Sequence, residues 1–161
     1  MGKQETEKWE GETRVEIQKV TTKQIWPLIS DFCSLHKWFP HVKTCYLLDG
    51  VPGQPGMIRY CGSTESPSED IQWVTEKLLT MDTTKIGFSY EIVDNNVGFK
   101  TYVSTIRLES IDGLDGAGGC RIVWSFVADP VEGYTFEGLI GFIKFTAEQM
   151  AARLEQALHE S

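Results

Sequence analysis

Two charged residues lie where the alternation of a strand would place them among apolar side chains. Glu76 has aliphatic residues at positions 74 and 78, and Arg59 has Met and Cys at positions 57 and 61. Side chains two residues apart point to the same face of a strand. If these faces point inward, a carboxylate and a guanidinium are buried, which is costly unless they pair or serve chemistry such as proton transfer.

Two tyrosines also share faces with apolar residues. Tyr90 lies among apolar residues at positions 86, 88 and 92, and Tyr102 shares its face with residues 104, 106 and 108. Each residue taken alone also fits a structural role, because an Arg can reach the rim of a sheet and a buried Tyr usually bonds a carbonyl. The other face of the run 71–79, which carries Trp73 and Leu79, could be the inward one instead.

Other catalytic and metal-binding patterns are absent from the sequence. His36, His41 and His159 have no second ligand at metal spacing, so we expect neither a metal site nor a cofactor. The chain has no Gly-x-Ser-x-Gly elbow, phosphate-binding loop or dinucleotide fingerprint. The Arg, Glu and Tyr residues therefore carry the chemistry that this sequence offers.

The length and charge favour one acidic domain. We expect a single domain over residues 1–161, with its core at about 9–159, because 161 residues with 41% hydrophobic content suffice for one core. The net charge of −8 argues against nucleic acid or an anionic membrane surface as a partner. Four widely spaced cysteines without a Cys-x-x-Cys pair, and an N-terminus without an apolar core, predict free thiols and a cytoplasmic location.

The order of elements is the main indication of fold. Residues 9–19 alternate as a half-exposed strand, Thr21 begins a helix to about 31 that Pro27 should kink or break, and 35–39 form a helical turn stopped by a proline. Turn residues then separate six predicted strands, at 42–48, 57–62, 71–79, 85–93, 99–109 and 121–128. The four glycines within 112–119 predict a mobile loop.

The last predicted element is a long amphipathic helix over 135–159. Apolar residues recur there at three- and four-residue steps, as in a helix that covers a sheet. Gly138 and Gly141 are unfavourable inside a helix, which indicates a close approach by either a strand or a ligand cavity. Together these elements predict an α+β fold in which a curled antiparallel sheet wraps around this helix, with room for a pocket between them.

An ordered set of short segments resembles the plant lachrymatory factor synthase group of the START-like, helix-grip superfamily, which also holds the birch pollen allergens and the abscisic acid receptors. The resemblance runs from about Trp9 to the C-terminus. Its segments are Asp31-Phe32-Cys33-Ser34-Leu35-His36-Lys37, Arg59-Tyr60, Glu76-Lys77-Leu78, Ser89-Tyr90, Gly98-Phe99, Tyr102 and Trp124-Ser125-Phe126. It implies a seven-stranded curved antiparallel sheet around the C-terminal helix, with two short helices after the first strand.

The resemblance also implies roles for individual residues. The catalytic Arg and Glu of that group fall on Arg59 and Glu76, and its two pocket tyrosines fall on Tyr90 and Tyr102. In the onion-type enzyme these residues isomerise a small sulfenic acid to a thial S-oxide, with the Glu moving a proton while the Arg and tyrosines hold the oxygen. This chain has Phe88 where the group has Tyr. The residues that we expect to line the ligand cavity are Phe88, Trp124, Leu139, Phe142 and Ile143.

Three functions fit the sequence. The first is a lachrymatory factor synthase-like isomerase or lyase that acts on a small sulfur or carbonyl compound. The second is a non-catalytic carrier of a hydrophobic metabolite or lipid, and the third is a ligand-sensing partner of another protein. The gate-loop motifs of the abscisic acid receptors are not recognisable, which disfavours a hormone receptor. A pocket that contains the Glu and the tyrosines favours the isomerase, whereas a large apolar cavity favours the carrier.

Overall fold

The computed structural model describes residues 7–64, 70–112 and 118–160. Most of the predicted loop 112–119 lies outside these ranges. The elements are β1 (Trp9–Gln18), α1 (Thr22–Ile29), α2 (Leu35–Trp38), β2 (Thr44–Asp49), β3 (Ile58–Gly62), β4 (Trp73–Asp82), β5 (Gly87–Asn95), β6 (Tyr102–Ser110), β7 (Gly119–Ala128) and α3 (Phe136–Glu160). This is the predicted order of one strand, two short helices, six strands and one long helix.

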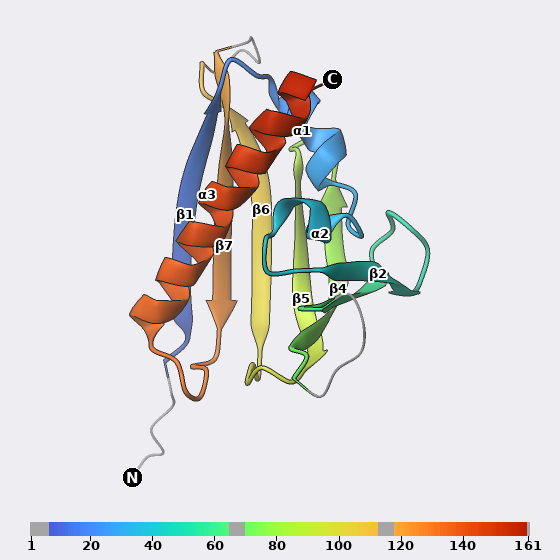
Figure 1. Cartoon of the computed structure of the whole chain (residues 1–161), viewed down its shortest axis with the longest axis vertical. Helices are drawn as coiled ribbons and strands as arrows, with labels where there is room; N and C mark the ends of the chain where they lie inside the picture. Colours follow the sequence, from blue (N-terminus) through green and yellow to red (C-terminus); the bar gives the residue numbers. More distant parts are fainter. Residues whose placement is uncertain (1–6, 65–69, 113–117, 161) are drawn as a thin grey trace.

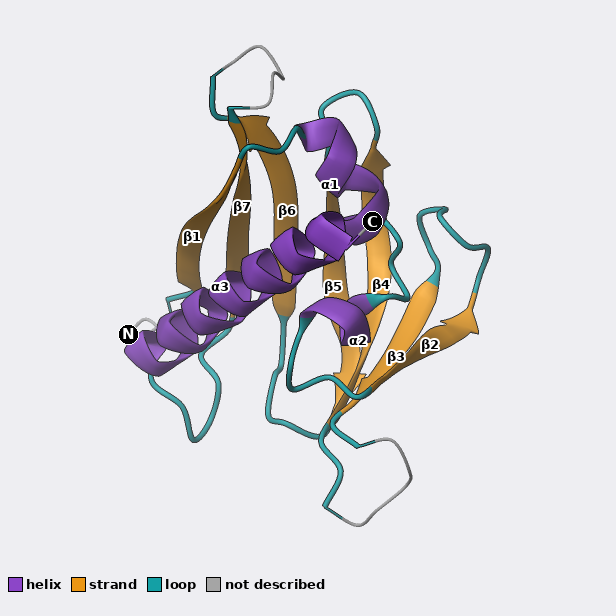
Figure 2. Ribbon diagram, turned by 45° about the horizontal axis from the view of Figure 1, so that its top comes forward, coloured by secondary structure: helices purple, strands orange, loops and turns teal. Residues whose placement is uncertain are grey.

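The strands form one antiparallel sheet that curls around α3. Their order across the sheet is β1-β7-β6-β5-β4-β3-β2, and every neighbouring pair is antiparallel. The segment between β1 and β2 crosses from one edge to the other and carries α1 and α2 over the concave side (Figures 1 and 2). The predicted α+β helix-grip fold is confirmed.

Helix α1 is short for reasons that are visible in its sequence. Its N-cap is Thr21, whose hydroxyl accepts from the backbone N–H of Gln24 while the Gln24 side chain accepts from the backbone N–H of Thr21. This reciprocal capping box satisfies two donors that the first turn would leave unpaired. Pro27 lacks a backbone donor, and the helix ends two residues later, at Ile29, rather than continuing to residue 31.

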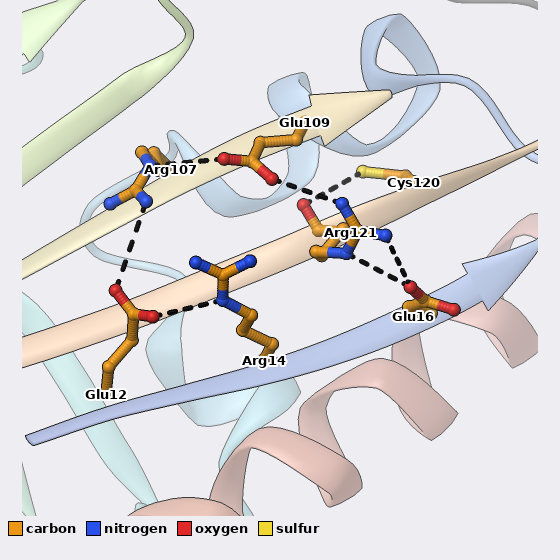
Figure 3. A network of polar contacts seen from close by, with 7 residues as sticks. All are labelled: Glu12, Arg14, Glu16, Arg107, Glu109, Cys120 and Arg121. Carbon is orange, nitrogen blue, oxygen red and sulfur yellow. Dashed lines mark hydrogen bonds and ion pairs between the residues drawn. The ribbon is translucent and has the colours of Figure 1, made fainter. Parts of the chain in front are cut away.

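Charged side chains of β1, β6 and β7 form a network of ion pairs on the solvent side of the sheet (Figure 3). Arg121 on β7 reaches Glu16 on β1 at 2.9 Å and Glu109 on β6 at 3.3 Å. Arg107 contacts Glu109 at 3.5 Å and Glu12 at 3.9 Å. Exposed ion pairs of this kind add little to stability, but they make this face of the sheet polar. The opposite, concave face is the one that packs under α3.

Helix α3 lays one apolar stripe on the concave face. Its buried side chains are Leu139, Ile143, Thr146, Ala147, Met150, Ala151 and Leu154. At the N-terminal end, the ring of Phe136 meets Trp9 of β1 edge to face, at 6.0 Å between centroids. Among the described residues, no helix is both long and apolar enough to cross a bilayer.

The predicted close approach at the two helix glycines is wrong. A Cβ atom on Gly141 would meet nothing within 4 Å, and one on Gly138 would meet only the hydroxyl of Thr135. Both positions face solvent rather than the sheet. The close approach occurs instead at Gly11 of β1, where a Cβ would collide with the side chains of Ile140 and Phe126. The close contact between α3 and the sheet is therefore made by a glycine of the strand, Gly11, and a branched side chain of the helix, Ile140.

Candidate functional site

Arg59 and Glu76 form a buried ion pair between neighbouring strands. They are direct partners in the register of β3 and β4. Nε and Nη2 of Arg59 lie 2.9 and 2.7 Å from the same carboxylate oxygen, Oε1 of Glu76. Arg59 is 2% exposed and Glu76 is 7% exposed. The inward face of β4 is thus the one with Glu76, whereas Trp73 stacks on Tyr60 on the other side of the strand.

The guanidinium of Arg59 is held from several sides. Nη1 donates to the carbonyl oxygen of Phe32, and Cζ lies 3.7 Å from the centre of the Phe32 ring and 4.9 Å from that of Tyr90. Burial, the largest single effect, lowers the pKa of Arg59, but the charge of Glu76 together with Cys61, Tyr90 and Cys45 outweighs it, and the pKa is raised. Arg59 therefore stays charged and keeps one oxygen of Glu76 fixed.

Two irregularities in the β4–β5 pairing direct Glu76 inward. The register shifts between Thr75 and Glu76, and again between Leu78 and Thr80. An extra residue in one strand bends an antiparallel pair and re-aims the neighbouring side chains. These shifts lie on either side of Glu76 and Leu78, both of which are buried. The bend also helps the sheet to curl over the cavity.

Tyr90 and Tyr102 stand on the adjacent strands with their hydroxyls in the same polar group. Burial raises the pKa of both phenols, and the charge of Glu76 raises them further, while hydrogen bonding to Ser104 opposes the shift. Both hydroxyls therefore remain protonated and can donate hydrogen bonds at neutral pH. Ser104 in turn accepts from the indole Nε1–H of Trp124 at 2.6 Å and donates to the Ser125 carbonyl at 3.1 Å.

A cavity of about 120 Å³ lies between these residues and α3. Its lining residues are Leu35, Phe39, His41, Val42, Cys61, Val74, Glu76, Tyr90, Ile92, Phe99, Tyr102, Trp124, Leu139, Phe142 and Ile143. A second, larger hollow of about 270 Å³ shares several of these residues, among them His41, Leu139 and Phe142, and we call it the vestibule. A larger hollow, of about 510 Å³, lies over the solvent side of β1, β6 and β7 and contains none of the candidate catalytic residues.

Most of the predicted site residues line this inner cavity. They are Glu76, Tyr90, Tyr102, Trp124, Leu139, Phe142 and Ile143. Arg59 and Phe88 are not among its lining residues. Arg59 lies behind Glu76, and Phe88 packs its ring against Trp26 and Phe32 at 6.2 Å between centroids in each case. Phe88 therefore does not line this cavity, because its ring packs against Trp26 of α1.

One oxygen of Glu76 is available to a ligand. Arg59 contacts only Oε1 of Glu76, and Oε2 of Glu76 has no hydrogen-bond partner within the described ranges. No buried side-chain nitrogen or oxygen of those ranges lacks a partner, so Oε2 must be accessible from the cavity that Glu76 lines. A carboxylate that Arg59 holds through one oxygen can accept a proton from a bound molecule at the other oxygen.

The sequence patterns did not indicate His41, which lines both the inner cavity and the vestibule. His41 packs between the ring of Phe39, at 5.7 Å, and that of Phe142, at 4.9 Å. Burial and the nearby charge of Lys43 lower the pKa of His41. The sequence signal was the aromatic turn before Pro40, where α2 ends and the chain continues through Phe39, His41 and Val42 along the wall of the cavity.

The described residues hold no cluster of three or more His, Cys, Asp or Glu side chains with metal-binding geometry. What the cavity offers instead is one free carboxylate oxygen, two phenolic donors and apolar walls. This set fits a small organic molecule with one polar end.

Comparisons with known proteins agree with this architecture. A family model described as polyketide cyclase/dehydrase and lipid transport matches residues 8–160. The protein XoxI from Bacillus cereus has a similar structure, with a TM-score of 0.71 and 23% identity over 92% of this chain and 94% of that one. An uncharacterised protein from Bacillus thuringiensis has a TM-score of 0.70 and 22% identity over 92% and 97%. At these identities the two structures show the fold alone. The family match covers nearly the whole chain, and the protein therefore belongs to the polyketide cyclase/dehydrase and lipid transport family.

Proposed function

We propose that this protein is an isomerase or lyase that binds a small compound with one polar end in the inner cavity and moves a proton on it with Glu76. The observation that supports this proposal most is the asymmetric carboxylate. Oε1 of Glu76 is fixed by Arg59, while Oε2 faces the cavity. A buried ion pair of this type is a costly way to stabilise a fold, and this cost supports a chemical role for the pair.

The chemistry divides among the residues as follows. Tyr90 and Tyr102 keep their protons and donate to an oxygen of the substrate, while Oε2 of Glu76 takes a proton from one atom of the substrate and returns it to another. The product is then an isomer of the substrate, and no other reactant is needed. Arg59 does not touch the substrate and acts by positioning Glu76.

The size of the cavity supports a small substrate. Pockets for drug-sized ligands usually have roughly 300–1,000 Å³. The inner cavity has about 120 Å³ and its vestibule about 270 Å³. A compact sulfenic acid or carbonyl compound, as the resemblance to the lachrymatory factor synthases implies, fits such a space.

A carrier of a hydrophobic metabolite is the second candidate, and the vestibule favours it. Apolar side chains line much of this hollow, and at its rim Phe142 and Tyr134 are 48% and 50% exposed. Exposed aromatic rings at the mouth of a cavity suit the uptake of an apolar ligand. A carrier would have no step for Glu76 to catalyse.

Replacement of Glu76 separates the two candidates. Glu76→Gln keeps the shape of the side chain but cannot carry a proton, so we expect the isomerisation rate of freshly generated small sulfenic acids to fall by about 10²- to 10⁴-fold. Ligand affinity should change far less. The assay is a coupled reaction that generates the sulfenic acid in the presence of each protein.

Glu91→Gln is the matched control, because Glu91 lies on the opposite face of β5 from Tyr90 and should leave the rate unchanged. Circular dichroism should show that both variants are folded. Equal rates for the wild type and a folded Glu76→Gln, or no acceleration by the wild type over several small substrates, would favour the carrier.

A further inference from the structure

Two cysteine side chains meet beside the ion pair. Cys45 on β2 and Cys61 on β3 are direct partners in the antiparallel register, and the Sγ–H of Cys61 donates to Sγ of Cys45 at 3.6 Å. Directly paired residues of antiparallel strands have Cα atoms about 4.5–5.5 Å apart, within the range that a disulfide spans. Both thiols are free in this structure.

The two sulfur atoms differ in their surroundings. Cys61 is 3% exposed and lines the ligand cavity, whereas Cys45 is half-buried on an edge strand whose following residues, 46–49, are exposed. The guanidinium of Arg59 acts on both thiols and favours a negative charge there. A thiolate forms more readily at Cys45, because Cys61 is more deeply buried and donates its proton.

We propose that Cys45 and Cys61 form an oxidation site for hydroperoxides, in which the two thiols convert reversibly to one disulfide at the wall of the ligand cavity. The Cys45 thiolate attacks one oxygen of the peroxide, the O–O bond breaks, and the sulfur becomes a sulfenic acid while the other oxygen leaves as water or an alcohol with a proton from solvent. Cys61 then attacks this sulfur, and the S–O bond breaks. The second oxygen leaves as water with the proton of Cys61, and the peroxide has accepted two electrons in total.

The charges around the dithiol agree with this order of steps. The largest effect on the pKa of Cys45 is the hydrogen bond from Cys61, which lowers it. Burial and the charge of Glu76 raise this pKa, whereas the charge of Arg59 lowers it. Together these effects lower the pKa of Cys45 to about 7. The same hydrogen bond and burial raise the pKa of Cys61. Cys45 is thus the attacking thiolate, and Cys61 keeps the proton that leaves with the water.

Cys33 is the matched control for reactivity. Its side chain is also half-buried and Arg59 acts on it too, but burial and the charges of Cys45 and Asp31 raise its pKa. At pH 7 iodoacetamide should therefore modify Cys45 roughly tenfold faster than Cys33 in the reduced full-length protein. Cys61→Ala removes the S–H donor and should shift the half-maximal rate at Cys45 to higher pH. Equal rates at Cys45 and Cys33 would contradict the assignment of Cys45 as the attacking thiolate.

The decisive experiment is treatment of the reduced protein with hydrogen peroxide, followed by alkylation, digestion and mass spectrometry. We expect the loss of two hydrogen atoms per chain and a peptide pair that joins Cys45 to Cys61 and separates with dithiothreitol. Cys33→Ser should give the same link. Cys61→Ala should instead accumulate a sulfenic acid on Cys45 that a 1,3-diketone traps. A wild-type protein that forms no Cys45–Cys61 link, or that links through Cys33, would overturn the proposal without need of any variant.

Discussion

Arg59 and Glu76 are two buried charged residues that must compensate each other if the protein is to fold. Two opposite charges in the interior stabilise each other only with close geometry and with partners for the remaining donors. Arg59 has both, through Glu76 and the carbonyl of Phe32. The rings of Phe32 and Tyr90 cover the guanidinium, so Arg59 acts on a ligand only indirectly, by holding Glu76 in place.

A double-mutant cycle should show that stability does not require the charges. Arg59→Met leaves a buried carboxylate and Glu76→Leu leaves a buried guanidinium, so each should lower the free energy of unfolding by about 3–5 kcal/mol. The double variant Arg59→Met/Glu76→Leu leaves no buried charge and should be more stable than either single variant. Urea denaturation followed by circular dichroism measures all four proteins.

The exposed pair of Arg14 and Glu12, 3.0 Å apart on β1, is the control for this cycle. Arg14→Met should change the free energy of unfolding by less than about 1 kcal/mol. If the two losses at Arg59 and Glu76 simply add in the double variant, the two side chains are not coupled and the ion pair is not the unit that we describe.

The packing of α3 on β1 shows how two elements share one close contact. The side chain of Ile140 occupies the space above Gly11, and the ring of Phe126 borders the same space. Strand glycines often mark such approaches. The helix glycines at positions 138 and 141 have no comparable neighbour from the sheet.

Alanine substitutions at the two kinds of glycine should have opposite effects. Gly141→Ala adds a methyl group in open space and removes the conformational freedom of a mid-helix glycine, so it should raise the free energy of unfolding by roughly 0.5–1 kcal/mol. Gly11→Ala forces Ile140 and Phe126 to move and should lower it by about 1–3 kcal/mol. Thermal denaturation compares both variants with the wild type. Stabilisation by Gly11→Ala would mean that α3 is further from β1 than described.

The elements themselves could be predicted because each has a local pattern. The alternation of β1 and the three- and four-residue steps of α3 correctly indicated the inward side of each element, although Phe142 and Phe145 of α3 are apolar and exposed. The direction of the Glu76 side chain was harder to predict, because both faces of its strand carry apolar residues. Only the cross-strand register with Arg59 and the shifts of register beside Glu76 decide which face is buried.

Contacts between segments that are distant in the sequence could not be predicted in this way. Cys45 and Cys61 are 16 residues apart, and their meeting depends on the register that the turn between β2 and β3 imposes. The position of His41 at the cavity depends on the path of the chain after α2. The glycines of α3 did not indicate that the close approach between α3 and the sheet occurs at Gly11 of β1. Residue types predicted which polar side chains are buried better than they predicted the path of the chain beside the cavity.

At the scale of the whole molecule, the fold sets the size of the ligand. The curled sheet and α3 border the inner cavity, while α2 and the segment after it bring Leu35, Phe39 and His41 to its wall. The large aromatic side chains of Phe39 and Trp124 stack at 5.3 Å between centroids and occupy space beneath the helix. These rings therefore reduce the space beneath the helix, and a volume of only about 120 Å³ remains in the inner cavity.

This small volume leads to a prediction about ligand length. A compound that binds only the folded state raises its stability, by about 2.7 kcal/mol at a concentration of 100 times Kd. In a thermal-shift series of linear aldehydes and fatty acids of increasing length, short aldehydes should raise Tm and long-chain fatty acids should not, because the inner cavity has about 120 Å³. Leu139→Trp should abolish the shift by filling the space that Leu139 lines, whereas Val127→Trp, at an exposed position of β7, should preserve it. A larger shift with the long-chain fatty acids, retained in Leu139→Trp, would mean that the ligand lies outside the inner cavity and beyond the reach of Glu76.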